Sequence, residues 1–170
     1  MMRKERTLNY WIEEKKLSPK DFIKFQESLL KDFYYEIYWT RRIFRENRFV
    51  FEHPRLAFLL HLRNIHEFFH GREFKDTVLV SQYLPSWQNK PIRKEIRDQI
   101  SSLNKFVTHL TYSRHDSKND FNEPELYKYV RSLTIDFLTH LSKTRWITPN
   151  LNVFLKELDQ EVKGESNKKS

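Results

Sequence analysis

The chain has 170 residues and no cysteine, which excludes disulfides, thiolate metal sites and a cysteine nucleophile. Its only glycines are Gly71 and Gly164, so the glycine-rich phosphate loops of P-loop and Rossmann proteins are excluded as well. The formal charge of +8 permits a polyanionic partner, because basic side chains that neutralise phosphates release bound counterions.

The N-terminal residues are basic, but no apolar run follows them, so no signal peptide is expected. The longest apolar stretches are far shorter than the roughly 20 residues that a membrane-spanning helix needs. The absence of cysteine fits a reducing compartment. We therefore expect a cytoplasmic protein with no membrane partner.

A first long helix is predicted over residues 19–47. Ser18 can cap its N-terminus, Pro19 suits the first turn, and Asp21 complements the helix dipole. A shorter helix is expected before it, at residues 8–15. Apolar residues recur at helical spacing through the long segment: Phe22, Phe25, Leu29, Phe33, Ile37 and Phe44.

Pro54 begins a second predicted helix, and Gly71 ends it at a position that favours a left-handed cap. Residues 73–90 are harder to assign. Pro85 argues against one continuous element, and a short strand, an irregular arm and a broken helix all fit the sequence.

A third long helix is predicted to start at Pro91 and to present a single apolar ridge to the core. Pro124 begins a fourth long helix, after a polar loop. The ridge of the third helix consists of Ile92, Ile96, Ile100, Leu103, Val107 and Leu110.

Thr148-Pro149 begins a last, short helix, and residues 163–170 have the composition of a disordered tail. We expect an all-α fold, in which about four long helices and short flanking helices form an antiparallel bundle. This bundle makes a single helical domain over residues 1–162.

The second predicted helix carries polar side chains within an otherwise apolar sequence. At about 100° per residue, one side of the helix holds Arg63, His66, Glu67 and His70, with Asn64 at its edge. Charged and titratable groups in such a place indicate either a reaction site or a polar contact between packed helices.

Leu56 and Leu59 share this side of the helix, so the polar group is continuous with apolar surface. We expect the surface to be covered, either by the third predicted helix or by a second copy of the chain. A two-fold homodimer is the natural closed form of the second arrangement.

Arginine and histidine together suit cleavage of RNA by its own 2′-hydroxyl group, which needs no metal ion. A guanidinium presents a fork of donors to phosphate, and Arg63 would stabilise the charge that builds there. A histidine titrates near neutral pH, and His70 would take or deliver the proton. His66 competes with His70 for this role.

Arg63-Asn64, followed by five residues and His70, resembles the R-x(4–6)-H motif of the HEPN superfamily. HEPN domains are small helical bundles that often dimerise. Many are metal-independent ribonucleases of defence and toxin systems, and others only bind. The resemblance implies that Arg63 and His70 are catalytic, that Asn64 orients a neighbour, and that an endoribonuclease of this kind would act on RNA without metal or cofactor.

A structural role explains the same residues. Arg63 and Glu67 are spaced as an ordinary ion pair on a helix surface, and histidines beside phenylalanines often only pack. The alternative is a non-enzymatic helical interaction protein, whose polar side chains set the register of packed helices. His66 and His70 have the spacing of two metal ligands, but no third ligand is evident, so no metal site is predicted.

Two polar residues near the end of the third predicted helix, Asn104 and His109, could support Arg63 and His70 in a buried network. A capping region with a satisfied core histidine is the preferred explanation for them.

Three arginines, Arg41, Arg42 and Arg45, alternate with aromatic residues in the first long helix. Arginines beside aromatic rings suit single-stranded RNA, since bases stack on the rings and phosphates pair with the cations. Aromatics at helical spacing are more often core residues, with the arginines as their solvated rim.

Overall fold

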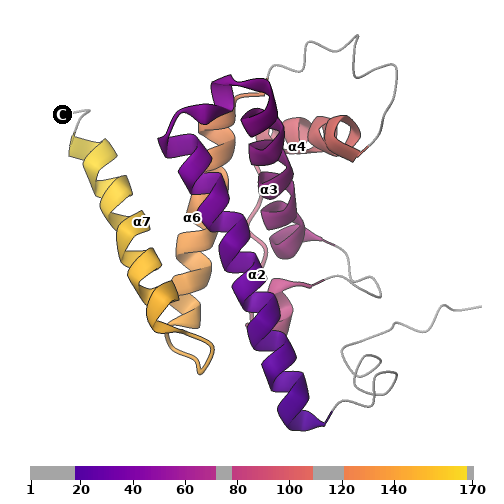
Figure 1. The fold of residues 1–170 in the computed structure, drawn as a ribbon, viewed down its shortest axis with the longest axis vertical. Helices are drawn as coiled ribbons and strands as arrows, with labels where there is room; N and C mark the ends of the chain where they lie inside the picture. Colours follow the sequence, from indigo (N-terminus) through magenta and orange to yellow (C-terminus); the bar gives the residue numbers. More distant parts are fainter. Residues whose placement is uncertain (1–17, 72–77, 109–120, 168–170) are drawn as a thin grey trace, which may run out of the picture.

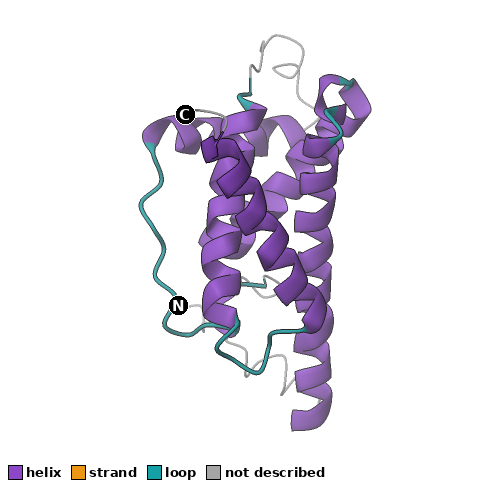
Figure 2. Cartoon of the chain, turned by 90° about the vertical axis from the view of Figure 1, so that its left-hand side faces the viewer, coloured by secondary structure: helices purple, strands orange, loops and turns teal. Residues whose placement is uncertain are grey.

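The structure is a computed structural model that describes residues 18–71, 78–108 and 121–167. This part of the chain contains five α-helices and no strand, which confirms the predicted all-α class (Figure 2). Short 3-10 turns lie at Arg48–Val50 and Val80–Gln82. The five helices are α2 (Pro19–Arg45), α3 (Glu52–His70), α4 (Lys94–Thr108), α6 (Glu123–Leu141) and α7 (Pro149–Asn167).

Four helices lie side by side and form two antiparallel hairpins (Figure 1). α3 returns along α2, and α7 returns along α6. α4 lies across α3, on the side of the molecule away from α7. α2, α3 and α6 therefore form the centre of the fold, with α4 and α7 at its two edges.

Two of the predicted helix starts, those of α2 and α7, have their capping hydrogen bonds in the structure. The Asp21 backbone N–H donates to the Ser18 hydroxyl at 3.2 Å, and the Leu151 N–H donates to the Thr148 hydroxyl at 3.3 Å. Such caps satisfy backbone donors that the first turn of a helix leaves unpaired. The helix expected at residues 8–15 lies outside the described residues.

Gly71 ends α3, but the predicted left-handed cap is wrong. Its φ and ψ angles are −60° and 162°, which is extended backbone, and its N–H donates to the Glu67 carbonyl at 2.7 Å. A Cβ atom at this position would overlap that carbonyl oxygen. The glycine therefore allows a close backbone approach.

Residues 78–93 form an irregular arm. This is one of the three structures that the sequence left open for residues 73–90. The arm contains a single 3-10 turn, and Val80, Tyr83 and Leu84 are buried against the core. The Tyr83 hydroxyl donates to the Gln26 carbonyl at 2.9 Å. α4 follows at Lys94, three residues later than predicted from Pro91.

α7 is longer than predicted and extends past Lys163, where a disordered tail was expected to begin. Residues 163–167 are helical instead. The Glu165 carboxylate accepts two hydrogen bonds from the Arg131 guanidinium, both at 2.7 Å. This contact to α6 stabilises the last turns of α7, whose composition alone favours disorder.

Phenylalanines from α2, α3 and α6 meet in the centre of the core. The rings of Phe33 and Phe68 are stacked with centroids 3.9 Å apart, and Phe137 packs edge-on against both. Aromatic pairs in such geometries add about 0.5–1.5 kcal/mol beyond the area that they bury. The predicted core faces of α3 and α6 are buried here, including Phe58, Leu62, Ile65, Leu126, Val130 and Leu141.

A network of charged side chains joins α7 to α2 and α6, with Glu161 at its centre. The Glu161 carboxylate accepts from Arg41 Nε at 2.6 Å and from the Tyr127 hydroxyl at 3.0 Å. Arg131 lies 3.8 Å away, and only 6% of its side chain is exposed. Buried charges are costly unless paired, so this network fixes the position of α7.

Arg131→Met is expected to lower the free energy of unfolding by about 1–3 kcal/mol, because it removes the donors that satisfy Glu165 and a cation beside Glu161. The control is Arg93→Met, whose 3.0 Å pair with Glu125 is 65% exposed on the arginine side and should contribute far less, because solvent screens it. Urea unfolding measures both values. Equal values for the two variants would contradict a structural role for the buried network.

Candidate functional site

α3 and α6 bring two histidines and a tyrosine together. His66 and His70 lie one helical turn apart, with ring centroids 5.0 Å apart. The hydroxyl of Tyr129, on α6, shares a 3.0 Å hydrogen bond with His66 Nδ1, and its ring is 6.3 Å from that of His70. The two histidines are therefore covered within one chain by α6, and not by the third predicted helix or a second copy as expected.

Burial keeps both imidazoles neutral at pH 7. It lowers the pKa of His66 to about 4, and the neighbouring His70 acts in the same direction. Burial also lowers the pKa of His70 and raises the pKa of the Tyr129 phenol. A neutral imidazole can accept a proton but has none to spare as an acid, so this cluster suits packing or general-base chemistry.

His70 differs from His66 in its hydrogen bonding. Within the described residues, its Nε2 is the one buried side-chain polar atom that has no hydrogen-bond partner. Leaving such an atom unpaired costs about 1–3 kcal/mol. Unsatisfied buried groups of this kind are uncommon and are often explained by function.

The other residues predicted around this site are only partly brought together. Arg63, Asn64 and Glu67 are half-buried on the same helix, and Arg63 has an interaction of its own rather than a free side chain. His109 and the side chain of Asn104 lie outside the described residues. Tyr129 was not predicted, because nothing local in the sequence links it to a histidine 63 positions earlier.

No group of three or more potential metal ligands occurs in the part of the chain that is described, although His66 and His70 have suitable spacing.

Stability should depend on pH through His66. Its pKa is about 4 in the folded protein and about 6.5 in an unfolded chain, so between these values only the unfolded chain binds the proton. The contribution of His66 to the free energy of unfolding is fully present above about pH 6.5 and decreases as the pH falls toward 4. His66→Gln should flatten this dependence, as measured by urea unfolding at a series of pH values.

The control for this experiment is His53→Gln, since His53 is exposed at the start of the same helix. It should keep the pH dependence of the wild type. A His66→Gln variant with an unchanged dependence would contradict the buried, neutral state of His66.

A second candidate site follows the outer side of α2, where aromatic rings and cations alternate. Lys31 Nζ lies 5.9 Å from the ring centroid of Tyr35, and the Arg42 guanidinium carbon lies 5.2 Å from that of Trp39. Tyr35 is 46% exposed and Trp39 is 39% exposed. We call Lys31, Tyr35, Trp39 and Arg42 the aromatic stripe.

Of the arginines predicted to contact RNA, Arg42 belongs to this stripe and Arg41 and Arg45 lie near it, but carboxylates already engage all three. Arg41 donates to Glu157 and Glu161, each at 2.6 Å, and its side chain is only 11% exposed. Arg45 lies 3.6 Å from Glu161. Arg42 donates to Glu46 at 2.9 Å, yet it remains 45% exposed and faces solvent with Trp39.

The sequence does contain the signal for the aromatic stripe. Lys31, Tyr35 and Trp39 are spaced by four residues, on the side of α2 opposite the buried Phe33 and Ile37. Large aromatic side chains on the solvent side of an amphipathic helix indicate a binding surface more than a core.

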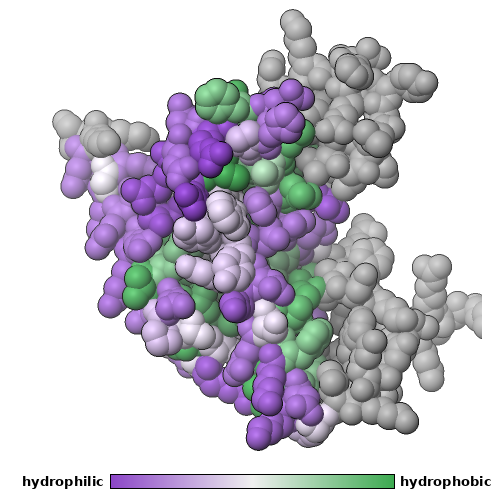
Figure 3. All heavy atoms as spheres, in the orientation of Figure 1, coloured by the Kyte–Doolittle hydropathy of each residue, from purple (hydrophilic) through white to green (hydrophobic). Residues whose placement is uncertain are grey.

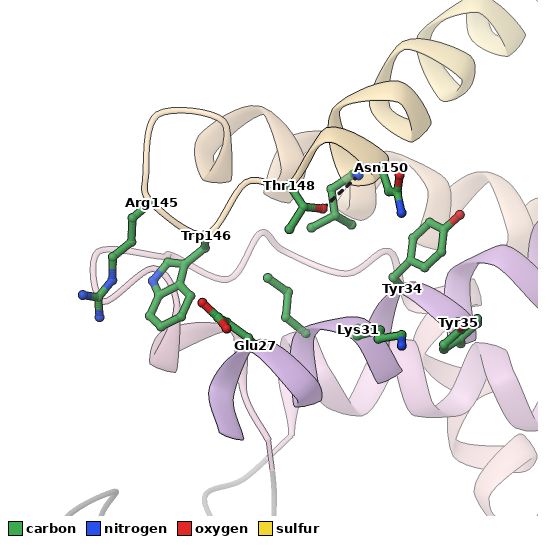
Figure 4. Close-up of a pocket in the computed structure, with 10 residues that line it drawn as sticks. Glu27, Lys31, Tyr34, Tyr35, Arg145, Trp146, Thr148 and Asn150 are labelled. Atoms are coloured by element: carbon green, nitrogen blue, oxygen red, sulfur yellow. Dashed lines mark hydrogen bonds between the residues drawn. The ribbon is translucent and has the colours of Figure 1, made fainter. Parts of the chain in front are cut away.

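Separate hollows lie between α2 and α7 beside the stripe, and we call this row of hollows the groove. A pocket of about 430 Å³ lies at one end, lined by residues of α2, of the loop that precedes α7 and of the first turn of α7 (Figure 4). Tyr38 and Arg41 line hollows farther along. This face of the molecule is largely hydrophilic and shows only separate apolar patches (Figure 3).

Comparisons with known proteins give no match: no protein-family model fits the chain, and no curated protein or solved structure is significantly similar to it. Among the helices described, none is both long enough and apolar enough to cross a membrane.

Proposed function

We propose that the protein binds single-stranded RNA along the aromatic stripe of α2. The observation that carries this proposal is the pairing of exposed rings with cations, Trp39 with Arg42 and Tyr35 with Lys31. Bases of any sequence stack on aromatic rings, while neighbouring cations pair with the phosphates. The net charge of +8 supports the proposal by attracting a polyanion over a longer range.

Trp39→Ala should weaken RNA binding by roughly 5- to 150-fold, which corresponds to the loss of about 1–3 kcal/mol from one stacked base. Fluorescence anisotropy of a labelled, unstructured RNA measures the change. The affinity of the wild type should fall as salt is raised, because phosphate contacts release counterions.

The matched control is Phe51→Ala, since Phe51 is a 65% exposed aromatic residue in the connection between α2 and α3. It should leave the affinity unchanged. Equal losses in both variants would contradict a specific role for the stripe, and a wild type that binds no RNA would overturn the proposal.

We propose a second function, metal-independent cleavage of RNA in the manner of the HEPN resemblance. One observation favours it, the unpartnered Nε2 of a neutral imidazole at His70. A neutral His70 can accept the proton of a 2′-hydroxyl once bound RNA displaces the side chains that bury this nitrogen, and Arg63, on the same side of α3, would stabilise the phosphate charge. The hydrogen bond of His66 to Tyr129 supports a packing role for that residue instead.

Purified wild type, incubated with mixed RNA in EDTA, is expected to leave 2′,3′-cyclic phosphate ends, and His70→Ala should abolish this cleavage. His53→Ala, an exposed position on the same helix, is the control. Circular dichroism verifies that each variant is folded. Cleavage that persists in folded His70→Ala protein would contradict catalysis by His70.

If neither RNA binding nor cleavage is found, the non-enzymatic interaction protein is the remaining proposal, with His66, His70 and Tyr129 fixing how α3 packs on α6. The homodimer stays a prediction. Since α6 covers the histidines within one chain, a second copy is not needed to bury them. Sedimentation over a range of concentrations tests it.

A further inference from the structure

The pocket of Figure 4 lies between the N-terminal half of α2 and the loop before α7. Aromatic rings stand at its two ends, Trp146 at one and Tyr34 with Tyr35 at the other. Leu30 and Leu151 form its apolar floor and are buried. A pocket with flat aromatic walls and an apolar floor suits a flat ring system.

Three charged side chains in this pocket have no carboxylate or cationic partner among the described residues. Lys31 contacts only the ring of Tyr35, and Arg145 contacts only that of Trp146, with its guanidinium carbon 4.5 Å from the centroid. Glu27 makes no hydrogen bond or ion pair in the described part of the chain. Its carboxylate lies beside Trp146, while Lys31 points away from it toward the tyrosines (Figure 4).

The pocket opens onto the aromatic stripe. The ring of Tyr34 lies 5.8 Å from that of Tyr35 and 6.1 Å from that of Tyr38, so aromatic surface is continuous from the pocket along α2. A strand whose bases stack along α2 can therefore place one further base in the pocket. Lys31 and Arg145, at the pocket rim, suit the phosphates on either side of that base.

We infer that the pocket receives a guanine base of the bound RNA, with the Glu27 carboxylate accepting hydrogen bonds from guanine N1–H and N2–H. A carboxylate has two acceptor oxygens and no donor. Guanine alone among the four bases presents two adjacent N–H donors on its Watson–Crick edge. Adenine presents one donor beside an acceptor nitrogen, which the carboxylate repels. This inference rests on the proposed RNA binding and adds base preference to it.

Anisotropy with two labelled oligonucleotides tests the inference, one of alternating U and G and one of alternating U and A. The wild type should bind the U–G strand roughly 5- to 100-fold more tightly, as expected for one bidentate base contact. Glu27→Gln replaces one acceptor oxygen by a donor. It should abolish the preference by weakening binding of the U–G strand, while the affinity for the U–A strand should be kept or rise, since the repulsion of adenine is removed and stacking and phosphate contacts remain.

Asp32→Asn is the matched control, because Asp32 is an exposed carboxylate of α2 that does not line the pocket. It should keep the preference for guanine. Equal binding of both strands by the wild type, or a preference that survives in Glu27→Gln, would overturn the guanine pocket while RNA binding stands. Failure to bind either strand would instead overturn the proposed function, and this inference with it.

Discussion

The carboxylate of Glu161 is the point where three helices are held together. It accepts hydrogen bonds from Arg41 of α2 and Tyr127 of α6, and Arg131 lies close by. A carboxylate that is only 17% exposed needs these partners, so α7 is stable only where both helices reach it. The groove between α2 and α7 depends on this position, since the buried apolar contacts of α7 are few: Leu151, Phe154 and Leu158.

α2 presents aromatic residues to two different environments. Phe33 and Ile37 are buried against α3 and α6, whereas Tyr35 and Trp39, two residues later in each case, remain exposed. Burial of apolar area explains the first pair and offers no reason for the second. The exposed pair is instead matched with cations, Tyr35 with Lys31 and Trp39 with Arg42, and the proposed RNA binding rests on this pairing.

Local sequence patterns predicted the helices. The features that these patterns did not predict, such as the length of α7, depend on contacts between residues far apart in the sequence. Helical spacing and the Ser18 and Thr148 caps depend on residues within a few positions, so they could be predicted. The length of α7 depends on the hydrogen bonds that Arg131 of α6 donates to Glu165. These two residues are 34 positions apart in the sequence, so no local pattern could predict the contact. Glu157, Glu161 and Glu165 do recur every four residues, but such a row is also typical of a solvated surface.

The candidate site was predictable only in part, for the same reason. Helix geometry places His66 and His70 on one side of α3, and the structure stacks their rings. The role of each histidine, as a general base or as a packing residue, depends on the side chains that cover it. The spacing of residues within one helix does not predict those neighbours. Tyr129 satisfies His66 and leaves His70 Nε2 unpaired. Two histidines of nearly equal sequence context thus differ in their hydrogen bonding. The groove lies between α2 and α7 and the histidines lie between α3 and α6, so the proposed RNA binding and the proposed cleavage can be tested separately.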